Sequence, residues 1–317
     1  MNDAEPDPLR DQLARLPREI EPSRDLWPGI EARLPAKPAR RPRRIVWLLP
    51  LAAALVIAAL VWRMPSGPSW SVATVAGAPR VGNRTVVEQA RLHVGQWLET
   101  DAGSTARIQV GAIGEVQVEP NSRLRLVSAA TTDHRLQLAR GRMSALIWAP
   151  PRLFFVETPS ATAIDLGCAY TLTVDDQGAG TLEVTAGYVS LEYGGLESIV
   201  PAGLMCLTRP GFGPGTPFAN NASQELRDAL ALFDAGDDTA VPRIVAAAVA
   251  GDGVTLWHLL ERAPAAARGA VFDRLARLHP PPAGVTRPGI VAGDAAMHDR
   301  WALDLGLWPL GAKKEKF

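Results

Sequence analysis

Hydrophobic and polar residues alternate one by one through the middle of the chain. The alternation is clearest in six segments: 107–110, 115–118, 123–126, 135–138, 170–174 and 181–184. A period of two places the apolar side chains of a strand on one face and the polar side chains on the other. Turn-forming residues such as Pro120-Asn121 separate these segments at short intervals. The pattern predicts an all-β domain over residues 70–209, with roughly ten or more short strands arranged as a sandwich, a barrel or a roll.

The period changes to that of a helix after residue 222. Leu226, Leu230 and Phe233 share one face of a helix predicted over 224–233, and Ser223 is a suitable N-cap. Similar patterns predict further helices over 241–250, 255–262, 265–278 and 294–305. Short connections are typical of antiparallel neighbours, so a helical bundle is expected over 223–310. Residues 210–222, which begin with several Pro and Gly residues, are expected to be a linker.

An apolar run without a charged residue extends from residue 45 to residue 62. Its length is close to the roughly 20 residues that a helix needs to cross a bilayer core about 30 Å thick. Trp47 and Trp62 stand at its two ends, where indole rings favour the membrane interface. The run predicts a transmembrane helix over 45–62. The alternative, a buried helix of a soluble domain, leaves the basic residues beside the run unexplained.

Basic residues are concentrated before this run. Four arginines lie within residues 40–44, whereas only Arg63 follows closely. The positive-inside rule therefore predicts that residues 1–44 are cytoplasmic and that the C-terminal domains are periplasmic. The expected location is the inner (cytoplasmic) membrane, crossed once, with residues 63–69 as a linker. A cleaved signal peptide would have a much shorter segment before its apolar run.

The N-terminal tail carries two apolar stripes with helical spacing. Helices as short as these are marginal in water, because they cannot bury an apolar face alone. We expect the stripes to dock into a groove of a cytoplasmic partner. Two alternatives stay open: the tail rests on the membrane surface, or it is disordered. The candidate partner-binding residues are Leu9, Leu13, Leu16, Leu26, Trp27, Ile30 and Leu34.

Charge and cysteine content narrow the function classes. Lys+Arg and Asp+Glu each number 33, so no net charge favours nucleic acid as a partner. Cys168 and Cys206 are the two cysteines, and both fall on the side predicted to be periplasmic. We expect a disulfide between them, with buried free thiols as the alternative. Two cysteines without a nearby histidine do not make a metal site.

No catalytic constellation is visible. The histidines are dispersed, without the spacing of a metalloprotease motif: His93, His134, His258, His279 and His298. His258 lies on an apolar helix and is expected to be a hydrogen-bonded core residue. Gly141, Gly167 and Gly187 stand at strand edges, where a bulge or a positive φ favours glycine. The sequence therefore predicts a protein that is not an enzyme and needs no cofactor.

Six stretches in the middle of the chain resemble, in order, the motifs of one known family. Residues 98–108 contain a stretch similar to its T-x-x-G-S-x-A motif, and residues 155–159 resemble its F-x-V-x-T-P motif. The other four stretches are 114–122, 136–142, 165–170 and 184–189. This part of the chain resembles the FecR domain, the periplasmic module of transmembrane regulators that control sigma factors of the extracytoplasmic-function type.

The resemblance implies a β-rich domain that relays an envelope signal to a cytoplasmic sigma factor by protein–protein interaction. An envelope or outer-membrane protein would be the second partner. The predicted fold class is mainly β plus α: a short cytoplasmic helical tail, one transmembrane helix, a FecR-like β domain and a helical bundle. The alternative function is an envelope scaffold or a ligand- or carbohydrate-binding module, whose N-terminal segment serves only as an anchor.

Overall fold

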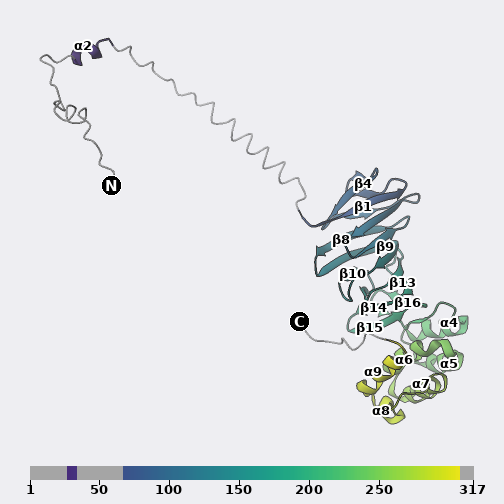
Figure 1. The fold of residues 1–317 in the computed structure, drawn as a ribbon. Coiled ribbons are helices and arrows are strands. Elements are labelled where there is room, and N and C mark those ends of the chain that lie inside the picture. Colours follow the sequence, from purple (N-terminus) through teal and green to yellow (C-terminus); the bar gives the residue numbers. More distant parts are fainter. Residues whose placement is uncertain (1–26, 34–66, 308–317) are drawn as a thin grey trace, which may run out of the picture. The chain divides into compact units, whose positions relative to one another are not determined.

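The computed structural model describes residues 27–33 and 67–307 of the chain (Figure 1). The chain divides into two compact units, Met1–Met64 and Pro65–Phe317. The described part of the first unit holds one helix, α2 (Trp27–Glu31). All the strands and the remaining helices of the described residues belong to the second unit.

The predicted fold class needs correction at its N-terminal end. Among residues 27–33 and 67–307, no helix is long and apolar enough to cross a membrane. The apolar run over 45–62 lies outside these residues. Helix α2 has five residues, fewer than the stripe from Leu26 to Leu34 predicts. The described structure therefore supports neither a transmembrane helix nor a helical tail, and it is strand-rich.

The second unit contains, in its described residues, eighteen strands in two sheets that are continuous through one long strand, β9 (Asp133–Ile147). Sheet A runs in the order β4 (Gln89–His93), β1 (Ser69–Ala76), β6 (Thr105–Val110), β7 (Gly114–Val118), β9, β12 (Ala169–Val174), β13 (Gly180–Ala186) and β16 (Leu204–Arg209). Two short strands, β17 (Gly213–Pro214) and β18 (Phe218–Ala219), pair with β16.

Sheet B runs in the order β3 (Arg84–Thr85), β2 (Arg80–Val81), β5 (Trp97–Glu99), β8 (Arg123–Ala130), β9, β10 (Phe154–Glu157), β11 (Thr162–Asp165), β14 (Tyr188–Tyr193) and β15 (Leu196–Pro201). Its pairs are antiparallel except β9 with β10. All six segments with alternating polarity lie in strands, and β6 has the burial pattern that alternation predicts. Each segment therefore has one buried face, and the opposite face is exposed in β6 and partly buried in β7, β12 and β13.

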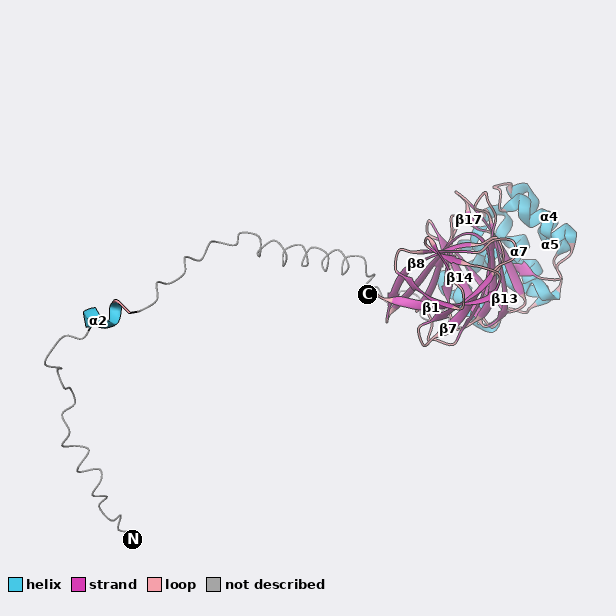
Figure 2. Cartoon of the chain, turned by 90° about the horizontal axis from the view of Figure 1, so that it is seen from above, coloured by secondary structure: helices cyan, strands magenta, loops and turns pink. Residues whose placement is uncertain are grey.

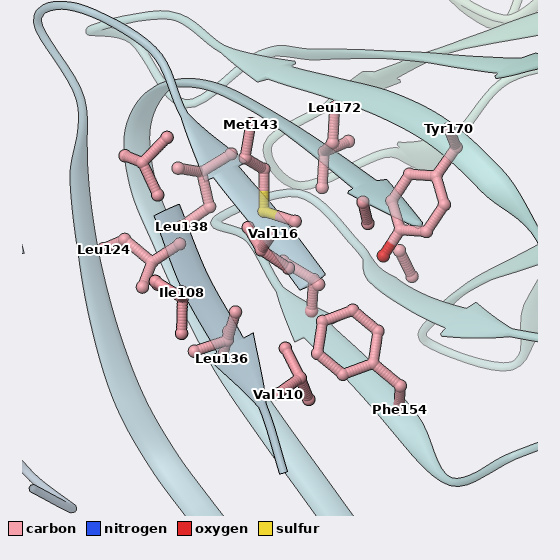
Figure 3. Close-up of a cluster of buried hydrophobic side chains, with 14 of the residues drawn as sticks. Ile108, Val110, Val116, Leu124, Leu136, Leu138, Met143, Phe154, Tyr170 and Leu172 are labelled. Carbon is pink, nitrogen blue, oxygen red and sulfur yellow. The ribbon is translucent and has the colours of Figure 1, made fainter. Parts of the chain in front are cut away.

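The inward faces of the two sheets form one hydrophobic core (Figure 3). Its largest side chains come from both sheets and are almost completely buried: Ile108, Leu124, Leu136, Leu138, Met143, Phe154, Tyr170 and Leu172. Burial of a large apolar side chain contributes about 1.5–3 kcal/mol, so this core is a major source of stability for the β region.

The helices gather at one end of the strands, beside β14, β15 and β16 (Figures 1 and 2). They are α4 (Gln224–Phe233), α5 (Val241–Ala247), α6 (Gly253–Arg262), α7 (Ala265–Leu278), α8 (Arg287–Ala292) and α9 (Ala295–Asp304), with 3-10 turns η1 (Asp238–Ala240) and η2 (Ala250–Asp252). Ser223 caps α4 by accepting the Leu226 N–H, as its position predicts. Helix α8, which contains Pro288 and Gly289, was not expected. Thr286 caps it, and its proline lies in the first turn.

The helices share a second hydrophobic core with the sheets. Ile199 of β15 and Phe218 of β18 are buried there with Leu226, Leu256 and Trp301. Residues 210–222, expected to be a linker, include β17 and β18 and contribute Phe218 to this core. The sheet region and the helices are therefore packed against each other rather than joined by a free linker.

Candidate functional site at the sheet–helix junction

Few of the residues predicted to bind a partner lie in the described residues. Trp27 begins α2, and its side chain is 65% exposed. Ile30 lies in the same short helix. The remaining five lie outside the described part: Leu9, Leu13, Leu16, Leu26 and Leu34. The partner-binding hypothesis for the tail therefore stays a prediction.

Cys168 and Cys206 are both buried free thiols. The Cys168 thiol donates to Asp165 Oδ2 over 2.5 Å, and the Cys206 thiol donates to the Gly215 carbonyl oxygen over 3.2 Å. Each sulfur thus has a hydrogen-bond partner close to it in the chain. The structure gives the second of the two sequence-based alternatives, buried thiols, rather than the disulfide.

Strand register explains why these sulfurs are far apart. Cys206 lies opposite Leu182 of β13, which lies opposite Leu172 of β12. Cys168 precedes Leu172 by four residues, or roughly 13 Å along a strand. The two strand spacings between β12 and β16 add about 4.8 Å each. A disulfide needs Cα atoms within about 7 Å, so this register excludes it.

A cavity of about 570 Å³ lies where sheet A meets the helices. Strands β12, β13, β16 and β17 form one side, and α4 and α6 supply side chains from the other. Leu207 and Phe212 make apolar walls at its mouth, and they are 41% and 61% exposed. The polar residues of the lining include Thr208, Arg209, Asp234 and Arg262. A volume of this size is typical of ligand pockets, which span about 300–1,000 Å³.

Arg262, at the end of α6, is the central polar group of the cavity. Its Nη2 donates to the Glu197 carbonyl oxygen over 2.8 Å and to Ser198 Oγ over 2.6 Å. Its Nη1 donates to Thr216 Oγ1 over 3.4 Å. Burial lowers the pKa of Arg262, and the neighbouring Cys206 and Asp234 raise it in part. An arginine stays protonated despite such a shift, so a cation stands at the junction.

Asp234 is the matching anion. As the C-cap of α4 it accepts the Thr216 N–H at Oδ2 and the Thr216 hydroxyl at Oδ1, both over 2.8 Å. Burial raises the pKa of Asp234, and the Thr216 hydrogen bonds and Arg262 act in the opposite direction. Gly215 allows this approach, because an added Cβ would lie 2.4 Å from Asp234 Oδ2. The segment between β17 and β18 is thus tied to α4.

Helix α6 also covers the outer edge of sheet B. Strand β15 pairs with β14 on one side. On its other side, two of its carbonyl groups form hydrogen bonds with side chains of α6. Arg262 bonds the Glu197 carbonyl, and His258 Nε2 lies 3.0 Å from the Ile199 carbonyl oxygen. Residues four apart on a helix share a face, and alternate carbonyls of a strand point the same way. His258 is therefore the buried, hydrogen-bonded residue that its apolar surroundings predict.

The cavity residues carried no recognisable sequence signal. Arg262 is 65 positions from Glu197 and 46 from Thr216, so no short motif contains them. The one weak signal in the sequence is that the apolar helix over 255–262 ends in a basic residue, Arg262. The arrangement can hold a small polar ligand or a partner side chain between an arginine and an aspartate.

The β region matches a known family. Residues 96–190 match the FecR protein model. The match runs from the residue before β5 into β14, through both sheets and the whole of β9. It confirms the resemblance predicted from the sequence motifs. Most of the cavity lining and all the helices from α4 onward lie outside the matched residues.

Two solved structures are also similar, both described as crystal structures of a candidate anti-sigma factor from Parabacteroides distasonis. The 1.65 Å structure has 13% identity and a TM-score of 0.34, covering 42% of this chain and 63% of that one. The 2.50 Å structure has 11% identity and a TM-score of 0.34, covering 47% and 73%. The chain thus spans less than two thirds of the first structure's length. Structural similarity this low establishes neither the fold nor the function of this chain. No curated protein matches the chain.

The FecR match supports a FecR-type regulator as the coarse function. FecR proteins are a regulatory rather than an enzymatic family.

Proposed function

We propose that this protein is a FecR-type regulator that relays a signal to a sigma factor by direct protein–protein contact, without catalysis. The observation that carries the proposal is the FecR match over 96–190, which covers a continuous region of the two sheets. In the described residues, Arg262 donates hydrogen bonds to Glu197, Ser198 and Thr216.

The sigma-binding segment of the proposal is the tail around α2. Trp27 is 65% exposed there, and large aromatic side chains commonly dominate the energy of protein interfaces. The neighbouring apolar positions of the sequence, Leu26 and Ile30, would extend the same surface. A partner with an apolar groove can bury such a stripe, whereas the tail alone cannot.

Capture of partners by the full-length chain tests this proposal. The variant combines Leu26→Asp, Trp27→Ala and Ile30→Asp. A matched control combines Asp25→Asn, Glu31→Gln and Arg33→Gln, which changes the same segment but leaves its apolar residues. We expect the wild type and the control to bind a sigma factor of the same cell with similar affinity. The variant that lacks the apolar side chains should bind it at least tenfold more weakly, which corresponds to about 1.4 kcal/mol of binding free energy.

Two results would contradict it. The first is no binding to any sigma factor by the wild type. The second is equal binding by the wild type and the apolar variant, which would exclude this segment as the contact. The first result would favour the alternative of a scaffold or a ligand-binding module, and the second would place the contact elsewhere in the chain. The localisation predicted from residues 40–62 stays a prediction, because those residues lie outside the described part of the chain.

A further inference from the structure

Three titratable side chains are buried together where the chain passes from sheet B to sheet A. Asp165 ends β11, Cys168 follows in the turn, and Tyr170 lies in β12. Their exposed fractions are 1%, 3% and 2%. Figure 3 shows the Tyr170 ring within the core between the sheets. The FecR match includes this turn but assigns no role to it.

The Asp165 carboxylate is held by hydrogen bonds from its own turn. Oδ1 accepts the Gly167 N–H over 2.7 Å, and Oδ2 accepts the Cys168 thiol over 2.5 Å. The Tyr170 hydroxyl is buried and has no hydrogen-bond partner. None of the ion pairs among the described residues includes Asp165. An ionised Asp165 is therefore a buried charge without a cation to offset it.

The pKa values follow this geometry. Burial raises the pKa of Asp165 to about 6, although the hydrogen bonds from Cys168 and Gly167 lower it in part. Burial also raises the pKa of Tyr170, and the Asp165 charge raises it further. Burial and the same charge raise the pKa of Cys168, so the thiol stays protonated. Asp165 is thus the group of this cluster that changes charge near neutral pH.

The turn is connected to the helices through β14. The Leu166 N–H donates to the Tyr188 carbonyl oxygen over 3.2 Å, and the Tyr188 hydroxyl donates to the Gly306 carbonyl oxygen over 2.7 Å, just after α9. Gly187 and Gly167 are in tight contact, since a Cβ on Gly187 would lie 2.1 Å from the Gly167 oxygen. A shift of the turn would therefore displace Tyr188 and its contact to the end of the helical region.

We propose that the turn containing Asp165 is a proton-sensitive junction: a protonated Asp165 can stay buried and keeps the turn closed, whereas ionisation favours opening of the turn to water and loss of the Tyr188 contact to the helices. The groups near the carboxyl group are the Cys168 thiol and the Gly167 N–H of the turn and the Tyr170 side chain of β12. Arg152 contributes only its backbone N–H, to the Asp165 carbonyl, while its guanidinium lies 3.4 Å from Glu192.

The direction follows from the raised pKa. A carboxyl group whose pKa is higher in the folded protein than in the unfolded chain makes the folded state bind more protons. The stabilising contribution of Asp165 is complete below its ordinary pKa of 3.8 and is lost as pH rises through about 6. Acid therefore favours the closed turn with a buried, uncharged Asp165, and neutral or alkaline pH favours the open one.

Hydrogen exchange of the full-length protein tests the junction, with rates corrected for the intrinsic effect of pH. We expect the amides of Leu166, Gly167 and Cys168 to be severalfold less protected at pH 8 than at pH 5. Asp165→Asn removes the charge, so the difference should disappear. Asp175→Asn is the matched control, because Asp175 is an exposed turn aspartate whose Oδ1 also accepts N–H groups. This variant should keep the difference.

Carboxyl titration by NMR gives a second measurement in the wild type, which does not depend on whether a variant folds. We expect one aspartate signal, absent from the Asp165→Asn spectrum if that variant folds, with a midpoint near 6. Titration of every aspartate near the ordinary 3.8 would overturn the proposal. Equal protection of the turn at pH 5 and pH 8, or an unchanged pH dependence in Asp165→Asn, would overturn it as well.

Discussion

Gly141 is the residue at which β9 leaves sheet B and enters sheet A. Arg140 on one side of it pairs with β8 of sheet B, whereas Arg142 on the other side pairs with β12 of sheet A. Gly141 has φ 94°, and an added Cβ would lie 2.3 Å from Ser122 Cα. A side chain is thus excluded both by backbone conformation and by space. The continuity of the two sheets depends on this glycine.

Replacing Gly141 by alanine should destabilise the protein by about 2–4 kcal/mol, because a strained backbone costs about 1–3 kcal/mol and the contact with Ser122 adds to it. Gly82→Ala is the matched control. Gly82 also has a positive φ, 57°, but nothing lies within 4 Å of an added Cβ. Gly82→Ala should lower the free energy of unfolding by close to 1 kcal/mol. Urea unfolding of the full-length protein measures both, and equal losses would show that the contact with Ser122 is unimportant.

At the scale of an element, α6 has two tasks. Its apolar residues fill the second core, and its polar residues Arg262 and His258 bond the carbonyl groups on the free edge of β15. An open strand edge is a template for pairing with another chain, and folded proteins commonly cover it. These contacts join residues 59 to 65 positions apart and tie the helix to the sheet.

Arg262→Met should lower the free energy of unfolding by about 2–4 kcal/mol, because it leaves buried acceptors unpaired and Asp234 without its neighbouring cation. Arg262→Lys should lie between this variant and the wild type, since a lysine keeps the charge but not the planar fork. Arg243→Met on the exposed face of α5 is the control and should change stability by less than about 0.5 kcal/mol. Guanidinium unfolding separates the three. A loss from Arg262→Met no larger than that of the control would contradict the role given to Arg262.

At the scale of the whole molecule, the described part of the second unit has two cores that meet at β14, β15 and β16. Val189, Leu191 and Val200 belong to the core between the sheets. Ile199 belongs to the core with the helices, and Tyr188 and Met205 pack against it. Neighbouring residues of the same strands thus serve both cores. We infer that the sheets and helices unfold together.

Removal of residues 223–317 should abolish cooperative folding of the remaining chain, because it exposes Ile199, Phe218 and the edge of β15. Removal of residues 1–64 is the control and should leave the melting temperature within a few degrees of the full chain, since the second unit begins at Pro65. Calorimetry checks both. A single sharp transition at the original temperature in the chain ending at residue 222 would show that the sheets fold alone.

The sequence alone determined much of the local structure. Alternation located parts of six strands, helical spacing located α4 and α7 with the bounds that they have, and Ser223 marked the N-cap of α4. The FecR motifs identified the domain, and the family match confirmed it. These features are readable because burial of one face imposes a period on neighbouring residues, whatever the rest of the chain does.

Only the tertiary structure decided which distant residues meet. Strand register separated Cys168 from Cys206, pairing with β16 placed β17 and β18 in the sheet, and docking of α6 brought Arg262 to Glu197. The buried position of Asp165 likewise depends on both sheets. Such contacts join residues tens of positions apart and leave no period in the sequence. Their geometry is set by long-range packing, which determines the cavity, the covered edge and the charge-sensitive turn.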